Sequence, residues 1–123
     1  MLWVTAVAGV AFAQDTPKPK IGALTKSLAN PFFLRMKEGY EYAQKKFDVD
    51  LVFGSTPTEE ANVEQLNILQ RWFEEGSIEA YVVTPFRPNS LNATLARISR
   101  ENIPIINIKL NVHTIKMYIS ASI

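Results

Sequence analysis

The chain alternates between short apolar runs and longer stretches in which apolar residues recur every three or four positions. The short runs predict strands at 20–25, 50–54, 80–84, 105–108 and 115–119. The first, third and fourth runs are short and apolar and do not alternate cleanly with polar residues. Such runs are typical of strands in a parallel sheet that is buried on both faces.

Three stretches between these runs carry apolar residues at helical spacing. The predicted buried faces are Phe33, Met36, Tyr40, Ala43 and Phe47 in the first helix, Val63, Leu66, Leu69 and Phe73 in the second, and Leu91, Leu95 and Ile98 in the third. Strands that alternate with helices, joined by right-handed crossovers, predict an α/β fold with an open, doubly wound parallel sheet.

Local signals predict where the helices begin and end. Asn30, followed by a proline, is a typical N-cap of the first helix. The segment 56–59, Thr-Pro-Thr-Glu, has the pattern of a capping box and predicts the start of the second helix. Gly76 is expected to end that helix. Asn89 is the predicted cap of the third helix, and Asn102 follows its end.

The segment 27–33, Ser-Leu-Ala-Asn-Pro-Phe-Phe, joins the first strand to the first helix and carries the most distinctive chemistry. Phe32 and Phe33 point about 100° apart on a helix, so we do not expect both to be core residues. The segment also lies beyond the carboxyl end of a strand, where open α/β sheets bind ligands. It is therefore a candidate binding site.

The loops after the third and fourth strands add compatible groups. Phe86 and Arg87 follow the third strand, and Asn107 and Lys109 close the fourth. Aromatic faces combined with planar polar groups suit a sugar or related polyol, whose C–H faces stack on rings while its hydroxyls form hydrogen bonds. The pattern therefore favours a binding role.

Composition excludes several other chemistries. The 123 residues fit one domain, and a net charge of +1 indicates neither a nucleic-acid nor a membrane partner. Cysteine is absent, and His113 is the single histidine. The first strand lacks a glycine-rich phosphate loop, and no carboxylate pair is placed at the strand ends. We expect no enzymatic activity, no cofactor and no metal.

The first thirteen residues are nearly all apolar or small and end in Ala-Phe-Ala, the pattern of a signal peptidase site. We interpret 1–13 as a signal peptide and 14–19 as a short tether, which predicts a periplasmic, secreted or cell-surface protein. No lysine or arginine precedes the apolar run, so a buried N-terminal segment is the alternative.

In order and spacing, these features resemble the N-terminal lobe of type I periplasmic binding proteins, the ribose-binding-protein-like receptors of bacterial sugar importers. The resemblance runs from about residue 18 to 108. It is carried by the strand 21–24, the Asn-Pro-Phe-Phe segment 30–33, Gly39, the Asn62 and Gln65 pair, and the segment 102–106.

The resemblance implies a strand order of 2-1-3-4-5 and a ligand held between two lobes that close like a hinge. The receptor would then deliver its ligand to the membrane permease of an ATP-driven (ABC) importer. By position, Asn30, Phe32 and Phe33 would contact the sugar. Lys26 would be a polar contact from the same loop.

The chain departs from the family pattern after the fourth strand. Sugar-binding members often carry Asp-Arg there, whereas this sequence has Lys109 and Leu110. Lysine cannot accept hydrogen bonds from hydroxyl groups. Together with Lys26 and Arg87, Lys109 would place cations near helix N-termini, so an acidic or phosphorylated ligand is a further hypothesis. The alternative is that Lys26 and Arg87 point into solvent.

Family members fold as two lobes, and residues 20–123 would supply a truncated first lobe. One interpretation is a solute-binding fragment with half a cleft, which we expect to bind sugars weakly or not at all by itself. The other is a non-binding or self-associating fragment, whose incomplete lobe exposes an apolar face or a sheet edge to another copy or to a second-lobe partner. A cytoplasmic sugar-responsive repressor core is disfavoured by the predicted signal peptide.

Overall fold

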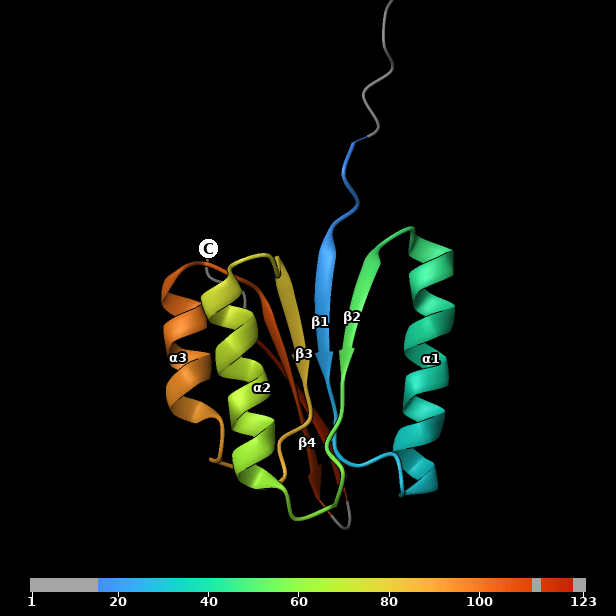
Figure 1. Cartoon of the computed structure of the whole chain (residues 1–123), viewed down its shortest axis with the longest axis vertical. Helices are drawn as coiled ribbons and strands as arrows, with labels where there is room; N and C mark the ends of the chain where they lie inside the picture. Colours follow the sequence, from blue (N-terminus) through green and yellow to red (C-terminus); the bar gives the residue numbers. More distant parts are fainter. Residues whose placement is uncertain (1–15, 112–113, 121–123) are drawn as a thin grey trace, which may run out of the picture.

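A single five-stranded sheet organises the chain, with helices on both of its faces (Figure 1). The computed structural model describes residues 16–111 and 114–120, so the predicted signal peptide and His113 lie outside the described residues. The elements in chain order are β1 (Lys20–Leu24), α1 (Pro31–Phe47), β2 (Asp50–Gly54), α2 (Asn62–Glu75), β3 (Ala80–Val83), α3 (Asn92–Arg100), β4 (Ile105–Asn111) and β5 (Thr114–Ser120).

The strand order is β2-β1-β3-β4-β5, as predicted. β1 to β4 are parallel to their neighbours, but β5 pairs with β4 in the antiparallel direction. The prediction of a fully parallel sheet is therefore wrong for its last strand, which is antiparallel. Only two positions separate β4 from β5, whereas a parallel connection needs a crossover of roughly a dozen residues or more.

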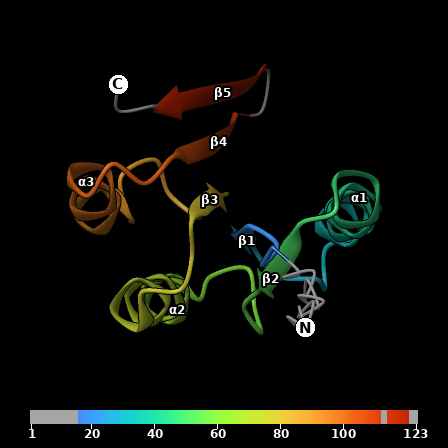
Figure 2. The same cartoon turned by 90° about the horizontal axis from the view of Figure 1, so that it is seen from above.

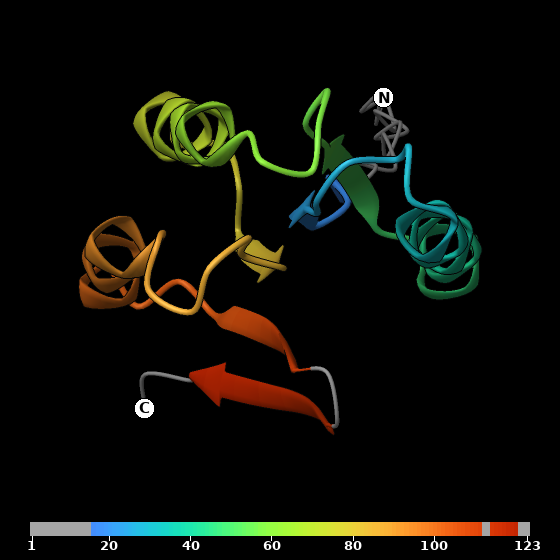
Figure 3. The ribbon, with the colours of Figure 1, turned by 90° about the horizontal axis from the view of Figure 1, so that it is seen from below.

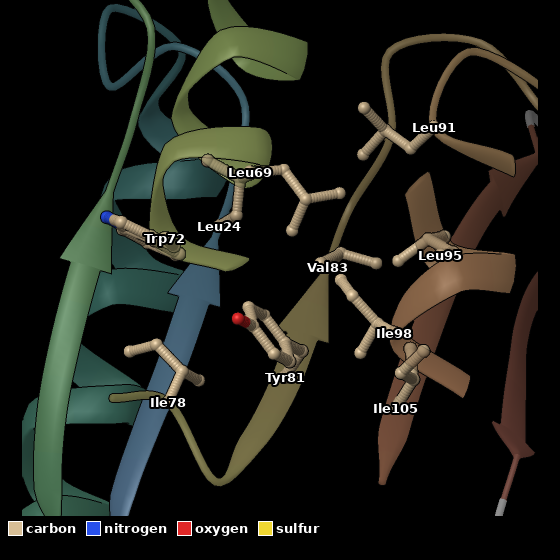
Figure 4. Packing of buried hydrophobic residues seen from close by; sticks show 10 residues of the cluster. All are labelled: Leu24, Leu69, Trp72, Ile78, Tyr81, Val83, Leu91, Leu95, Ile98 and Ile105. Carbon is tan, nitrogen blue, oxygen red and sulfur yellow. The ribbon is translucent and has the colours of Figure 1, made fainter. Parts of the chain in front are cut away.

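The two faces of the sheet are covered unequally. α2 and α3 lie side by side on one face, and α1 lies alone on the other (Figures 2 and 3). The buried core lies beneath α2 and α3 (Figure 4). Its members are Leu24, Leu69, Trp72, Ile78, Tyr81, Val83, Leu91, Leu95, Ile98 and Ile105. The predicted buried face of α3 is thereby confirmed.

The buried face of α2 agrees in part with the prediction. Leu69 is buried, and Leu66 and Phe73 pack against the core as partly buried residues. Val63 is 67% exposed instead, and Gln65 and Trp72 are buried as well. Gly54 explains part of this change, because a Cβ at this position would lie 2.8 Å from the Trp72 ring. The absence of a side chain on β2 leaves room for the indole against the sheet backbone.

The ends of α1 match the sequence signals. Asn30 caps the helix, and its Oδ1 accepts a hydrogen bond of 3.0 Å from the backbone N–H of Phe32. Gly76 after α2 and Asn102 after α3 have positive φ angles of 71° and 60°, as expected for residues that end helices. These local predictions are confirmed.

The predicted caps of α2 and α3 are wrong. Thr56 is buried in the loop, where its hydroxyl donates to the carbonyl of Thr58 at 2.9 Å and cannot cap a helix. α2 begins only at Asn62, without a side-chain cap. α3 begins at Asn92 instead of directly after Asn89, because the intervening residues form a turn in which the Oδ1 of Asn89 accepts from the Asn92 side chain.

The face beneath α1 is open. Of the five apolar positions predicted to be buried on α1, Phe33 is buried and Phe47 is 66% exposed. A groove of about 390 Å³ runs between this helix and the sheet. It is lined by Ile21, Tyr40, Ala43, Gln44, Phe47, Val49, Leu51, Val82, Ile106 and Ile108. In this chain, then, one sheet face is closed and the other is partly uncovered.

The fit of Trp72 against Gly54 can be tested by a matched pair of glycine substitutions. Gly54→Ala should lower the free energy of unfolding by about 1–3 kcal/mol, because the new methyl group overlaps the indole. Gly39→Ala, in the open middle of α1, should raise it by about 0.5–1 kcal/mol through the lower chain entropy of alanine. Urea denaturation measures both values, and equal effects of the two variants would contradict the packing described.

Candidate functional site

A pocket of about 510 Å³ lies at the carboxyl ends of the parallel strands. The connections β1–α1, β2–α2 and β3–α3 meet there, at the end of the sheet that faces the viewer in Figure 3. The lining residues are Lys26, Asn30, Phe33, Glu59, Glu60, Asn62, Phe86 and Arg87. The pocket therefore occupies the place where open α/β sheets bind ligands.

Four residues predicted from the sequence line this pocket together. They are Lys26, Asn30, Phe33 and Arg87. Phe32 and Lys109 are not among the lining residues. Their participation in binding, like that of the other four, stays a prediction.

The two adjacent rings are placed differently, as the helical geometry requires. Phe33 is 4% exposed and turns inward, whereas Phe32 is 47% exposed. The ring centroids lie 5.2 Å apart in an edge-to-face arrangement. Phe33 thus contributes an aromatic surface at the pocket, and Phe32 buttresses it from the solvent side.

Sequence reasoning missed the acidic side of the pocket. The capping-box pattern predicts that Glu59 and the adjacent Glu60 belong to the first turn of the second helix, and no carboxylate pair is expected at the strand ends. Both expectations are wrong, because the two residues belong to the loop that precedes α2 and line the pocket. The misleading signal was the capping-box pattern at 56–59. Once that segment is a loop after β2, the position of both carboxylates at the strand ends follows from the topology.

Lys26 lies between two aromatic rings. Its Nζ is 5.7 Å from the centroid of Phe33 and 5.6 Å from that of Phe86. Burial lowers the pKa of Lys26, and the charge of Glu59 acts in the opposite direction. The structure therefore holds a partly desolvated ammonium group against aromatic faces, an arrangement that favours the cation.

Asn30 has both a structural and a chemical role at the pocket. Its Oδ1 accepts the capping hydrogen bond of α1, and its Nδ2 group takes no part in that bond. A cap fixes the side chain relative to the helix axis. The amide is consequently a pre-positioned hydrogen-bond donor.

Hydrogen bonds from side chains to the backbone hold the three connections together. Ser27, which is buried, donates from its hydroxyl to the carbonyl of Pro57 at 3.3 Å and accepts from the N–H of Ala29 at 3.2 Å. Gln65 links the residues after β1 to those after β3. The pocket is therefore built on connected loops.

Within residues 16–111 and 114–120, no group of three or more histidine, aspartate or glutamate side chains is placed to hold a metal ion. No helix in the described part of the chain is both long and apolar enough to cross a membrane.

Most of this chain is similar in sequence to part of a known binding protein. It is 30% identical over 98 residues to the D-ribose/D-allose-binding protein of Pseudomonas aeruginosa, and the match covers 78% of this chain and 30% of that protein. No family model matches the sequence. The chain thus spans about a third of this relative's length.

Solved structures share the fold. An ABC transporter solute-binding protein from Burkholderia multivorans superposes with a TM-score of 0.71 at 27% identity, covering 79% of this chain and 35% of that one. A periplasmic solute-binding protein from Actinobacillus succinogenes with bound D-allose gives 0.70 at 26% identity, covering 77% and 34%. A periplasmic ribose ABC transporter protein from Conexibacter woesei, at 16% identity and a TM-score of 0.68 over 80% of this chain and 32% of its own, supports the fold alone.

The capping role of Asn30 gives a test of the site's framework. Asn30→Ala should destabilise the chain by about 1 kcal/mol, because the first turn of α1 loses its side-chain acceptor. Asn30→Asp keeps an acceptor and should retain the stability of the parent. Thermal or urea unfolding of the three proteins measures this, and equal losses in both variants would show that the cap is not the cause.

Proposed function

We propose that the chain is the N-terminal lobe of a type I, ribose-binding-protein-like solute-binding protein and that its pocket forms one wall of a sugar-binding cleft. The proposal is supported by the fold that the chain shares with ABC solute-binding proteins and by its 30% identity to part of a D-ribose/D-allose-binding protein. The observation that carries the proposal is the joint placement of Lys26, Asn30, Phe33 and Phe86 around one pocket at the strand ends. The Pseudomonas relative is a D-ribose/D-allose-binding protein, and the Actinobacillus structure holds D-allose. Both support a sugar or related polyol as the ligand class.

The charges around the pocket favour a neutral ligand. Lys26 and Arg87 are cationic, whereas Glu59 and Glu60 are anionic, so the formal charges of the lining cancel. An acidic or phosphorylated sugar would meet two carboxylates as well as two cations. Carboxylates also accept hydrogen bonds from hydroxyl groups, a capability that lysine lacks. The acidic-sugar hypothesis is therefore the weaker one.

The pocket supplies only part of the enclosure that tight binding needs. Small-molecule sites bury about 70–90% of a ligand's surface, whereas this pocket is one open wall. The relatives named above are about three times as long as the segment they share with this chain. The second wall would come from a second lobe.

The proposed role is binding and delivery. We place the protein outside the cytoplasm, with the membrane permease of an ABC importer as its partner and without a bound cofactor. The relatives that support this assignment are described as binding proteins, and two of the solved structures as periplasmic. Catalysis is not part of the proposal.

Calorimetry on the isolated chain and on a chimera tests the proposal. The chain alone should bind D-ribose and D-allose only at millimolar concentration or above, because a single wall encloses too little of a sugar. A chimera that joins residues 20–108 to the remaining lobe of the Pseudomonas relative should bind one of these sugars at least 100-fold more tightly.

Two outcomes would contradict the proposal. Micromolar binding by the isolated chain would contradict the claim that the chain supplies only one wall of the cleft. A folded chimera that binds neither sugar would contradict the claim that this wall binds a sugar. Tighter binding of an acidic sugar than of a neutral one would reverse our order of the two ligand hypotheses.

The groove beneath α1 supports a second candidate role, in which the chain associates with another copy of itself. Its lining is largely apolar, and Phe47 at its edge is 66% exposed. Contiguous apolar surface of this kind favours association. This role accounts for the open sheet face, which the sugar-binding proposal does not use.

Sedimentation equilibrium distinguishes the two roles. The parent chain should show concentration-dependent association, and Phe47→Glu should weaken it at least 10-fold by placing a charge in the groove. Tyr42→Glu is the matched control, because Tyr42 is on the same helix, is also 66% exposed and does not line the groove. A monomeric parent at high concentration would rule this role out.

A further inference from the structure

Gln65 carries a fully buried side-chain amide whose N–H and carbonyl groups all form hydrogen bonds with backbone groups. Its side chain is 0% exposed. The Nε2 group donates to the carbonyls of Thr25 at 3.2 Å and Thr84 at 2.9 Å, and Oε1 accepts from the N–H of Phe86 at 3.2 Å. One side chain from α2 therefore binds the connections that leave both β1 and β3.

These partners lie next to the residues that shape the pocket. Thr25 directly precedes Lys26, and the N–H of Phe86 belongs to the residue whose ring faces the Lys26 ammonium. Among the described residues, the last backbone hydrogen bond between the two strands runs from Thr84 N–H to Leu24 C=O at 2.9 Å. Beyond that point the Gln65 amide bridges the two connections.

We infer that Gln65 is a positioning residue of the pocket: it fixes the two connections relative to each other so that the Lys26 ammonium lies between the rings of Phe33 and Phe86. The inference rests on the proposed function only for the identity of the ligand. The placement of Lys26 between the two rings can be measured on the chain without any ligand.

A primary amide fits this place for a chemical reason. It offers two N–H donors on one side and an acceptor on the other, which matches two carbonyls and one N–H. Glutamate has the same shape but would set an oxygen against both carbonyls. Methionine fills a similar volume and leaves three buried backbone groups without partners.

The titration of Lys26 reports on this positioning without any ligand. Burial lowers the pKa of Lys26 in the parent chain. In Gln65→Met the connections should separate and the ammonium should become hydrated, so its pKa should move back toward 10.5. NMR of the lysine side chains measures the pKa, and the ring-current shifts of the Lys26 methylene protons should shrink in parallel.

Leu69→Val is the matched control. Leu69 is on the same helix one turn further along, is also 0% exposed, and belongs to the apolar core. Its truncation loosens the core without removing a hydrogen bond from the pocket. Glu59, Glu60 and Arg87, the other ionisable groups of the lining, are unchanged in every variant. Lys26 should therefore titrate in Leu69→Val as it does in the parent.

A second variant keeps the test decisive if Gln65→Met fails to fold. Gln65→Asn retains a buried amide but is one methylene shorter, and it should shift the Lys26 titration in the same direction. The inference is overturned if the folded Gln65 variants leave Lys26 unchanged, or if Leu69→Val changes it equally. Because no sugar enters the experiment, this failure is distinct from a failure of the sugar-binding proposal.

Discussion

The packing of the Trp72 indole against bare sheet backbone determines where α2 lies, and the pocket depends on α2. A Cβ on Gly54 would come within 2.8 Å of the indole and one on Gly22 within 3.1 Å, so the ring fits closely over β1 and β2. Gln65 lies two helical turns before Trp72 on the same face. The contact that seats the helix on the sheet thereby also delivers the Gln65 amide to the carboxyl ends of β1 and β3.

The unequal covering of the sheet puts the buried core on one face and an open apolar groove on the other. The face under α2 and α3 holds the buried core. The face under α1 keeps an apolar groove open beside Tyr40 and Phe47. Apolar surface left in contact with water carries a free-energy cost of roughly 25 cal/mol per Å², which any partner that covers the groove would remove. The candidate pocket and the apolar groove thus lie on different parts of this fold.

Signals carried by adjacent residues predicted the fold well where no tertiary contact competed with them. Asn30 and the proline after it set the start of α1, and the positive φ angles of Gly76 and Asn102 follow two helix ends. The capping-box pattern at 56–59 failed because the Thr56 hydroxyl is used inside a buried loop. That loop brings Glu59 to the pocket, and no local pattern encodes such a tertiary position.

The last strand and the α2 core show a second limit. The predicted strands 105–108 and 115–119 leave six positions between them, already too few for a parallel crossover, but the apolar pattern by itself does not register strand direction. Strand direction follows from connection length, not from hydrophobic pattern. On α2, the helical period allowed several apolar faces. The choice of Trp72 over Val63 depended on glycines in β1 and β2, which a period along one helix cannot register.

The environment of Lys26 combines these constraints at the site. Desolvation destabilises its ammonium group, while the ring faces of Phe33 and Phe86 and the charge of Glu59 stabilise it. The pocket thus holds a partly desolvated cation of its own between two aromatic rings.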